Sequence, residues 1–467
     1  MTVTPKSPTR MNLPRVVRSI LTVFFLGALS LGCNKKAGQE LPNFIVILAD
    51  DLGWRDVGYN GSAYATPHID ALAAGGMQFT SAYAASPACS PTRASLLTGF
   101  EPARLKLTRA IRISDLDGTA KPKDNAQWIG PDSLSHLPFD EESLASKLKE
   151  AGYDTGFVGK WHLGLPPHVP KRYGFAEAKA VGLYSACPHF APYNKFLDAQ
   201  DAPVGEPLTK RLTDEALRFI RQKRERPFFL MLSHFAVHGP WQADPALEAR
   251  WRRELDPEAP QGNATYAAMI EGLDTSIGRL MNALKDLGLR DDTLVLFLSD
   301  NGPTLEKNDQ RLTTTAPLKG AKTELYEGGI RIPFVASWPG HIEGGQKIDD
   351  PISTIDVYPT LLSLAGVKHR TVDGIDLSEG FLQQEWAEER DLYFHFPHRS
   401  FTSAIRRGPY KLIHHHRGSD ELFDLTADIG ESNNLIESEP ERAENLRAAL
   451  LAQLHSYDAG FGRPRNE

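Results

Sequence analysis

Cys89, one of three cysteines in this 467-residue chain, begins a stretch suited to holding an anion. In SPACSPTRASLLTG, Ser90 can cap a helix and Pro91 can occupy its first position. The helix would run to Gly99, with Cys89 at its positive end and Arg93 one turn further in. From these residues alone a thiolate nucleophile, a metal ligand and a buried structural cysteine all remain open.

Paired polar residues follow two apolar stretches that are typical of buried parallel strands. NFIVILADD ends in Asp50 and Asp51, and TLVLFLSDNGP contains Asp300 and Asn301. Open α/β sheets bring the carboxyl ends of their strands to one edge, where ligands bind. Carboxylates that converge there need a cation, and hard oxygen ligands favour Ca²⁺ or Mg²⁺ over zinc.

Basic residues stand in short polar breaks near other apolar stretches. Lys160 and His162 follow the strand-like TGFVGKW, His238 ends PFFLMLSHFAVH, and Lys322 lies in PLKGAKTE. With Arg93 they would form a pocket for a tetrahedral anion through charge-assisted hydrogen bonds. The two histidines are also candidates for proton transfer near neutral pH.

The elements that must position these side chains alternate between helix and strand. This alternation predicts an α/β fold, with a large, mostly parallel or mixed sheet covered by helices on both faces. From about Val367 the pattern changes to short strands and a final helix, which predicts a smaller C-terminal α+β subdomain. We therefore expect domains over 42–366 and 367–467, with loops at 101–140 and 164–210 facing the substrate.

Composition and charge narrow the classes of function. The hydrophobic content of 41% and charged content of 24% are ordinary for a globular protein, which argues against global disorder and several membrane spans. The net charge of −7 gives no basic surface for nucleic acid, so we expect no nucleic-acid partner and place any anion site in a local pocket.

The N-terminal residues resemble an export signal rather than part of a fold. Three arginines precede the twelve-residue apolar run ILTVFFLGALSL, which suits a signal peptide and is too short to span a bilayer comfortably. Gly32 and Cys33 follow as in a bacterial lipoprotein cleavage site, although Ser30 stands where leucine is usual. We expect a signal segment over 1–33 and a polar tether over 34–41.

Several outcomes for this segment remain open. An acylated Cys33 would attach an exported, periplasmic or cell-surface protein to a membrane, and ordinary signal cleavage nearby or a retained anchor are the alternatives. If Cys33 is lipidated or removed and Cys89 has a special role, only Cys187 remains. No internal disulfide framework is then available, and stability must come from the core.

Cys89 to Arg93 have the form C-x-P-x-R, followed by ASLLTG, and resemble the motif of type I sulfatases of the alkaline phosphatase superfamily. Further blocks are similar to that family in the same order: ILADDLGWRDVGYNGS, TPHIDALAAGGMQFTSAYA, GYDTGFVGKWHLG, HFAVHGPWQ, SDNGP and PLKGAKTELYEGGIRIPFVASWPG. The resemblance covers roughly residues 42–440. It implies the alkaline-phosphatase-like sulfatase fold and the hydrolysis of sulfate esters.

The resemblance also implies a cofactor and a set of site residues. A separate maturation enzyme would oxidise Cys89 to Cα-formylglycine, whose hydrate provides an oxygen nucleophile. A Ca²⁺ ion, with Mg²⁺ as the alternative, would be held by Asp50, Asp51, the modified residue 89, Asp300 and Asn301. The sulfate would be surrounded by Arg93, Lys160, His162, His238 and Lys322.

The same scheme gives the polar side chains their roles in the reaction. Asp300 would accept a proton from the nucleophile as it attacks sulfur in line. His238 and Lys322 would protonate the departing alcohol oxygen. His162 would deprotonate the second hydroxyl of the hydrate, so that sulfate is expelled and the aldehyde returns.

Two positions depart from the family pattern. Phe100 follows LLTG where arginine is usual, and Arg104 is a nearby candidate for that role. Gly239 separates His238 from Pro240 where threonine is common. We expect these differences to affect helix anchoring and pocket shape rather than the chemical step.

An exported sulfatase with long loops favours sulfated poly- or oligosaccharides as substrates. The glycan subsites would be lined by His189, Trp241, Gln242, Arg399 and the three histidines 414–416, although residues of this kind more often belong to ordinary surface loops. One alternative is a formylglycine-dependent phosphonate or phosphate ester hydrolase of the same superfamily. A second is a non-catalytic glycan-binding surface protein.

Overall fold

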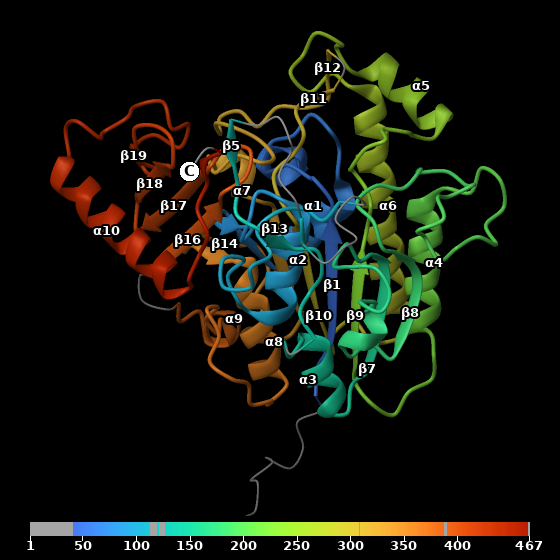
Figure 1. Cartoon of the computed structure of the whole chain (residues 1–467). Coiled ribbons are helices and arrows are strands. Elements are labelled where there is room, and N and C mark those ends of the chain that lie inside the picture. The colour runs from blue at the N-terminus through green and yellow to red at the C-terminus, as the bar shows by residue number, and fades with distance from the viewer. Residues whose placement is uncertain are drawn as a thin grey trace, which may run out of the picture. The chain divides into compact units, whose positions relative to one another are not determined.

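Figure 1 shows a computed structural model of the chain. It describes residues 41–112, 119–120, 127–139, 141–307, 309–386 and 390–465. Leu41–Glu467 form one compact unit. The expected signal segment, with Cys33, and residues 34–40 of the expected tether lie outside the described residues. Among the described helices, none combines the length and the apolar character that a membrane crossing requires.

A mixed eight-stranded sheet occupies the centre of this unit, with the order β14-β2-β13-β10-β1-β9-β7-β8. Only β13 runs antiparallel to its neighbours, and the other neighbouring pairs are parallel. The strands are β1 (Asn43–Ala49), β2 (Met77–Phe79), β7 (Asp154–Lys160), β8 (Glu177–Gly182), β9 (Phe228–Ser233), β10 (Thr293–Ser299), β13 (Phe334–Ser337) and β14 (Gln346–Ile348). The predicted mostly parallel, mixed sheet is confirmed.

Strand β1 is buried on both faces because its side chains alternate between two cores. Phe44, Val46 and Leu48 pack into one core with residues of α2, α3, α8 and α9. Ile45 and Ile47 pack into the other with α1, α4 and α6 (Figure 1). The helices are α1 (Pro67–Ala74), α2 (Cys89–Thr98), α3 (Leu144–Glu150), α4 (Leu208–Ile220), α5 (Pro245–Glu254), α6 (Ala264–Asp286), α7 (Glu327–Ile330), α8 (Val357–Leu364), α9 (Ser378–Gln383) and α10 (Pro440–Ser456).

Three boundaries differ from the sequence-based expectations. The strand expected to reach His238 ends at Ser233, because Ala236 and Val237 instead exchange backbone hydrogen bonds with Asp50 (3.0 and 2.7 Å). Helix α2 starts at Cys89 rather than after a Ser90 cap, because the Ser90 hydroxyl accepts from the Ile111 amide (3.0 Å). The expected loop 164–210 contains β8, an edge strand whose polar first half gives it little of the apolar pattern of a strand.

The C-terminal part is an α+β unit, as predicted. Its antiparallel sheet has the order β16-β17-β18-β19, and α10 packs on one face. The other face shares a core with residues of the larger part, including Tyr83 and Ile330. The strands here are β16 (Asp391–Phe396), β17 (Thr402–Arg407), β18 (Tyr410–His415) and β19 (Glu421–Asp424). Short paired strands complete the described structure: β3 (Ala82–Tyr83) with β15 (Ile352–Ser353), β4 (Thr119–Ala120) with β6 (Ser133–Leu134), β5 (Trp128–Ile129) with β20 (Arg463–Pro464), and β11 (Glu306–Lys307) with β12 (Gln310–Arg311).

Candidate functional site

Four acidic or sulfur-bearing side chains meet at the carboxyl edge of β1 and β10. One ligand atom from each of Asp50, Asp51, Cys89 and Asp300 lies within 4.8 Å of the others, and all four residues are buried. The Asp51 amide donates a hydrogen bond to Asp300 Oδ1 (3.1 Å), which links the two strand ends. The structure thus brings together the acids that the sequence predicted at this edge. We refer to these four residues together with Asn301 as the acidic centre.

Cys89 enters the acidic centre from the first turn of α2. Its Sγ lies 3.6 Å from Asp50 Oδ1 and 3.8 Å from Asp51 Oδ1, and the residue is 1% exposed. Burial raises the pKa of the thiol, and the Asp300 carboxylate acts in the same direction. The unmodified side chain is therefore held as a thiol at neutral pH, which argues against a thiolate nucleophile.

Arg93, one turn along α2, is fixed by four hydrogen bonds. Its Nε and Nη2 both donate to Asp300 Oδ2 (2.9 and 2.8 Å). Its Nη1 donates to the Lys160 carbonyl (2.8 Å) and to Ser233 Oγ (2.5 Å). Most of the guanidinium is therefore used to orient Asp300 and to tie α2 to the ends of β7 and β9.

Two lysines neutralise the other carboxylates, and a histidine lies beside one of them. Lys160 Nζ is fully buried and donates to Asp50 Oδ2 (2.6 Å). Lys322 Nζ lies 2.6 Å from Asp51, and His238 Nε2 lies 3.8 Å from Asp51 Oδ2. The side chains of Lys322 and His238 keep 17% and 20% of their surface exposed, so these two residues mark the open side of the acidic centre.

The two histidines of the site are neutral in this environment. Burial lowers the pKa of His162 well below its usual range, and Lys160 adds to the effect. His162 Nε2 donates to the Ile111 carbonyl (2.8 Å), which leaves Nδ1 buried with no partner among the described residues. Burial and then Lys322 lower the pKa of His238 to about 3, and its Nδ1 donates to the Gly239 carbonyl (2.6 Å). Each ring therefore keeps one nitrogen that can accept a proton.

The oxygen atoms of the acidic centre fit a hard divalent cation. Asn301 Nδ2 donates to Asp51 Oδ1 (2.7 Å), and Asn301 Oδ1 is buried without a hydrogen-bond partner in the described part of the chain. Burial raises the pKa of Asp50 to about 7 even though Lys160 opposes the shift, so protein cations compensate this carboxylate incompletely. An orphaned amide oxygen beside three carboxylates is the donor set that Ca²⁺ or Mg²⁺ takes.

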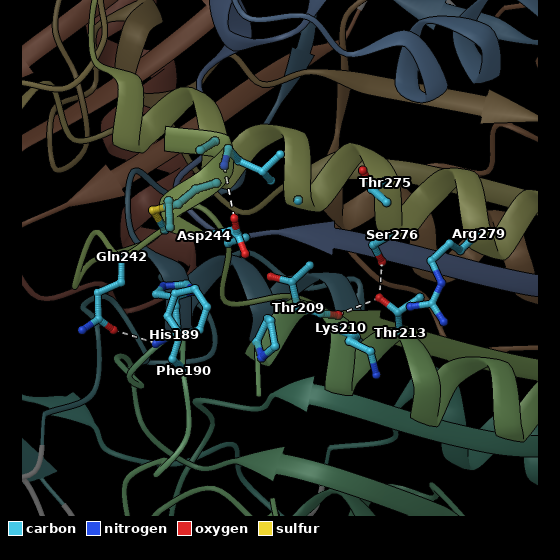
Figure 2. A pocket seen from close by; sticks show the side chains of 17 residues that line it. His189, Phe190, Thr209, Lys210, Thr213, Gln242, Asp244, Thr275, Ser276 and Arg279 are labelled. Atoms are coloured by element: carbon cyan, nitrogen blue, oxygen red, sulfur yellow. Dashed lines mark hydrogen bonds between the residues drawn. The ribbon is translucent and has the colours of Figure 1, made fainter. Parts of the chain in front are cut away.

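Two of the residues expected to line glycan subsites have other contacts. His189 is buried and its Nε2 donates to the His238 carbonyl (2.8 Å). The His189 amide donates to Gln242 Oε1 (2.9 Å), as Figure 2 shows. These two side chains therefore support the segment that carries His238.

The other expected subsite residues are separate from the acidic centre or only adjoin it. The Trp241 ring lies against Gly239, where a Cβ would come within 3.2 Å of the indole. Arg399 is exposed in the turn after β16, and the described residues include no hydrogen bond from it to the acidic centre. His414, His415 and His416 bond to Asp420, Glu421 and Ser403 in the C-terminal sheet.

The residues considered at the position after LLTG, Phe100 and Arg104, both contact parts of the chain outside the acidic centre. Phe100 packs into the core, and Arg104 pairs with Asp373 (2.7 Å) and lies over the Tyr457 ring. Arg104 is thus engaged with the C-terminal part of the chain, and no hydrogen bond or ion pair described for it reaches the acidic centre.

Sequence reasoning missed two groups that position the site. Ser233 Oγ accepts from Arg93. Ser233 is the last residue of β9 and lies on the same edge of the sheet as the acids, so the rule that the carboxyl ends of the strands meet at one edge could have identified it. The Ile111 carbonyl orients His162 from a loop, and no sequence pattern marks it.

Two family models together match most of the chain. The family model described as Sulfatase matches residues 42–367, and that of N-sulphoglucosamine sulphohydrolase, C-terminal, matches residues 321–459. N-acetylgalactosamine-6-sulfatase of Mus musculus is 33% identical over 409 residues, covering 82% of this chain and 74% of its own. Arylsulfatase A of Bos taurus is 31% identical over 477 residues, covering 90% of this chain and 88% of its own.

A solved structure gives the same result for the fold. The crystal structure of Ps i-CgsB in complex with k-i-k-neocarrahexaose superposes with a TM-score of 0.77 at 29% identity. The match covers 89% of this chain and 93% of that one. Both the large sheet and the C-terminal part are therefore shared along almost the whole length.

Proposed function

This chain belongs to the sulfatase family and is an enzyme that hydrolyses sulfate esters, and we propose that it acts on sulfated carbohydrates with residue 89 in its formylglycine form. The observation that carries the proposal is the position of Cys89 among three carboxylates, of which Asp51 contacts Lys322 and His238 on the open side. The carbohydrate substrate is supported by the likeness to Ps i-CgsB, whose structure holds a neocarrahexaose.

The acidic centre would hold the cation through Asp50, Asp51, Asp300, Asn301 and residue 89. Ca²⁺ is the proposed ion, with Mg²⁺ as the alternative. The bound cation supplies Lewis-acid activation, and the hydrated formylglycine supplies an oxygen nucleophile. Arg93 keeps Asp300 in one orientation, so that this carboxylate can accept a proton at Oδ1 or Oδ2 beside residue 89.

The cations then divide between the inner and the open side of the site. Lys160 is fully buried and stabilises negative charge from within. Lys322 stays protonated, since burial favours its neutral form but Asp51 outweighs this and holds its pKa above the usual range. Lys322 and His238 lie on the side from which an alcohol leaves. His162 offers Nδ1 as a base within the buried part of the site.

We also propose that the protein is exported to the periplasm or cell surface. The support is the apolar run before Gly32 and Cys33, with Cys33 as the residue that a lipid would modify. A formylglycine-generating enzyme is a transient partner in this proposal, and nucleic acid is not a partner.

The test pairs the two cysteines that the structure describes as free and buried, Cys89 and Cys187. The protein is produced together with a formylglycine-generating enzyme, and the peptide containing residue 89 is examined by mass spectrometry. Sulfate release is then screened on defined sulfated galactan, fucan and glycosaminoglycan fragments. We expect formylglycine at residue 89, activity in wild type and Cys187→Ala, and none in Cys89→Ala.

Two results would contradict the proposal. An active preparation in which residue 89 is still cysteine would remove formylglycine from the mechanism. Turnover of a phosphonate ester without release of sulfate from any sulfated sugar would favour the phosphonate hydrolase alternative.

A further inference from the structure

A cavity, whose lining residues Figure 2 shows, adjoins the segment that carries His238. It has a volume of about 560 Å³ and lies between the first turns of α4, the start of α5 and the middle of α6. Its deep part is apolar, with Ala236, Ala268 and Met269 almost fully buried. Its rim is polar and carries Lys210, Gln242, Asp244, Thr275 and Arg279. An apolar floor with a few polar groups at the rim is typical of small-molecule sites of this size.

Gly272 keeps this cavity open. It lies in the interior of the 23-residue helix α6, where glycine lowers helix stability relative to alanine. A Cβ built on Gly272 would meet nothing within 4 Å, so neither packing nor the backbone requires glycine. Gly278 on the same helix is different, because a Cβ there would lie 2.6 Å from the His68 ring. Any larger side chain at position 272 would instead project into the cavity.

The end of the rim formed by α4 and α6 carries two cations, Lys210 and Arg279, against one carboxylate. Lys210 and Arg279 share a single carboxylate, Asp214, at 2.7 and 2.6 Å. Asp244 adds a negative charge to the rim at the start of α5, where it accepts from the amides of Ala246 and Leu247. Thr209 and Thr275 add hydroxyl groups to the same rim.

We propose that this cavity is a second binding site, for a small organic anion with an aromatic or alicyclic body. The body would lie against Met269, Leu247 and Phe190, and the anionic group would face Lys210 and Arg279. The size and the apolar floor of the cavity favour such a ligand over an inorganic anion, which would leave the floor unfilled.

The cavity is coupled to the proposed catalytic residues through its wall. His189 lines the cavity and donates to the His238 carbonyl, and Gln242 of the rim accepts from the His189 amide. Ala236 also lines it, and its carbonyl accepts from the Asp50 amide (3.0 Å). An occupant therefore touches the segment that positions His238 and Asp50, and turnover changes when the site fills. This last step rests on the proposed role of His238.

Binding can be tested with 1-anilinonaphthalene-8-sulfonate, an aromatic sulfonate, followed by fluorescence titration. We expect saturable binding to one site in wild type and in Gly272→Ala, which changes the helix without filling the cavity. In Gly272→Trp the affinity should fall by about tenfold or more, and in Lys210→Gln by about threefold. Thr275→Trp, at an exposed position of the same rim, is a second blocking variant in case Gly272→Trp does not fold, and thermal unfolding identifies folded variants.

Equal affinity in Gly272→Ala and in a folded blocking variant would overturn the proposal. The titration is repeated on Cys89→Ala, which should bind the probe as wild type does. Binding is thereby separated from sulfatase activity, and a failure of the proposed function leaves this result intact.

Coupling is tested on the matured enzyme with an aryl sulfate. We expect the probe to lower kcat with little change in KM, and the effect to be absent from the blocking variants. Competitive inhibition of the same strength in wild type and blocking variants would place the probe in the catalytic site and overturn the proposal.

Discussion

At the scale of single residues, each carboxylate of the acidic centre is paired with one cation of the protein. Lys160 pairs with Asp50, Lys322 with Asp51, and Arg93 with Asp300. Buried carboxylates are costly unless they are neutralised, and this pairing keeps the centre folded. Of the three cations, Lys322 alone has a substantially exposed side chain, so it is the one placed to contact a substrate.

Lys322→Met should therefore affect catalysis more than folding. We expect kcat/KM for a sulfate ester to fall by about 100-fold, because a charge-assisted donor to the reacting group is lost. Lys319→Met, in the same loop but directed at the Tyr326 ring and Glu421, is the matched control and should stay within about twofold of wild type. Steady-state kinetics decides the point, and equal losses in the two variants would argue against a role for Lys322 at the sulfate.

Asn301 gives a second prediction at this scale. Its orphaned Oδ1 should be a ligand of the cation, so Asn301→Ala should weaken Ca²⁺ affinity by about 10- to 100-fold. Removal of the cation with a chelator should lower the thermal midpoint of the wild type, and added Ca²⁺ should restore it. Isothermal titration of the chelated protein with Ca²⁺, and separately with Mg²⁺, measures the affinities and identifies the preferred ion, and a thermal scan measures the midpoints. Wild-type affinity in Asn301→Ala would exclude Asn301 as a ligand.

The convergence of the acids could be predicted from the sequence, because it depends only on strand direction and on which residues end each strand. The one-to-one pairing of acids and bases could not, since it depends on side-chain directions. The same limit applies to His189 and Gln242. Their bonds join segments about 50 residues apart along the chain, and no local pattern specifies such contacts.

At the scale of elements, α2 depends on the residue that ends it. Gly99 has a φ of +73° in the left-handed region, and its amide donates to the Ser95 carbonyl. A Cβ there would lie 3.0 Å from the side chains of Tyr358 and Val372, so α2 is seated tightly against α8 and the loop that follows it. Gly99 thereby fixes the far end of the helix whose first turn holds Cys89 and Arg93.

Gly99→Ala should destabilise the protein by about 2–3 kcal/mol, the sum of left-handed strain and a steric contact. Gly366→Ala is the control, because Gly366 has a φ of +65° but nothing within 4 Å of its Cβ. It should cost about 1 kcal/mol from backbone strain alone. Urea unfolding of the two variants compares the costs, and equal values would show that α8 yields to the new methyl group.

The sequence predicted the elements better than their ends. Helices and buried strands have clear apolar periods, which is why β1, β10 and α6 could be located. The early end of β9 could not be predicted, because residues 234–237 (HFAV) continue its apolar run. The backbone groups of Ala236 and Val237 nevertheless form hydrogen bonds with Asp50 instead of extending the strand. The start of α2 was missed because Ser90 is occupied by the Ile111 amide.

At the scale of the whole molecule, a buried charge cluster ties the C-terminal sheet to the larger part. Lys411 of β18 lies 2.9 Å from both Glu327 at the start of α7 and Glu431, and all three side chains are buried. Glu431 also accepts from the Glu327 amide (2.7 Å). The two parts are therefore joined by charge as well as by a shared core.

This cluster predicts a pH dependence of stability. Burial raises the pKa of Glu431 to about 7, although Lys411 opposes the shift. The folded state then keeps a proton that the unfolded chain releases above its usual pKa of 4.5, so stability falls as the pH rises from about 4.5 to 7. Glu431→Gln keeps the acceptor for the Glu327 amide but has no group that titrates. The free energy of unfolding of this variant should therefore rise relative to wild type by about 1 kcal/mol per pH unit over that range.

Thermal midpoints between pH 5 and 8 measure the difference. Glu421→Gln is the control, because the pKa of Glu421 is lowered to about 2, with burial opposing and hydrogen bonds from His415 and Tyr326 favouring the shift. The stability that the ionised Glu421 contributes is lost only below its usual pKa of 4.5. The difference between Glu421→Gln and wild type should therefore be constant from pH 5 to 8. A constant difference for Glu431→Gln as well would contradict the assignment.

The burial of α2 has a consequence for the order of events during synthesis. Every residue of α2 is buried and Cys89 is 1% exposed, so an enzyme that oxidises this cysteine has to reach it before the chain folds. Strand β1 is synthesised early, but its two neighbours in the sheet are β9 and β10, where it pairs with Phe229 and Thr293. The centre of the sheet therefore forms only after β10 has been synthesised. If residue 89 is oxidised as proposed, oxidation and folding compete for the same nascent chain, and their relative rates set the fraction of molecules that become active.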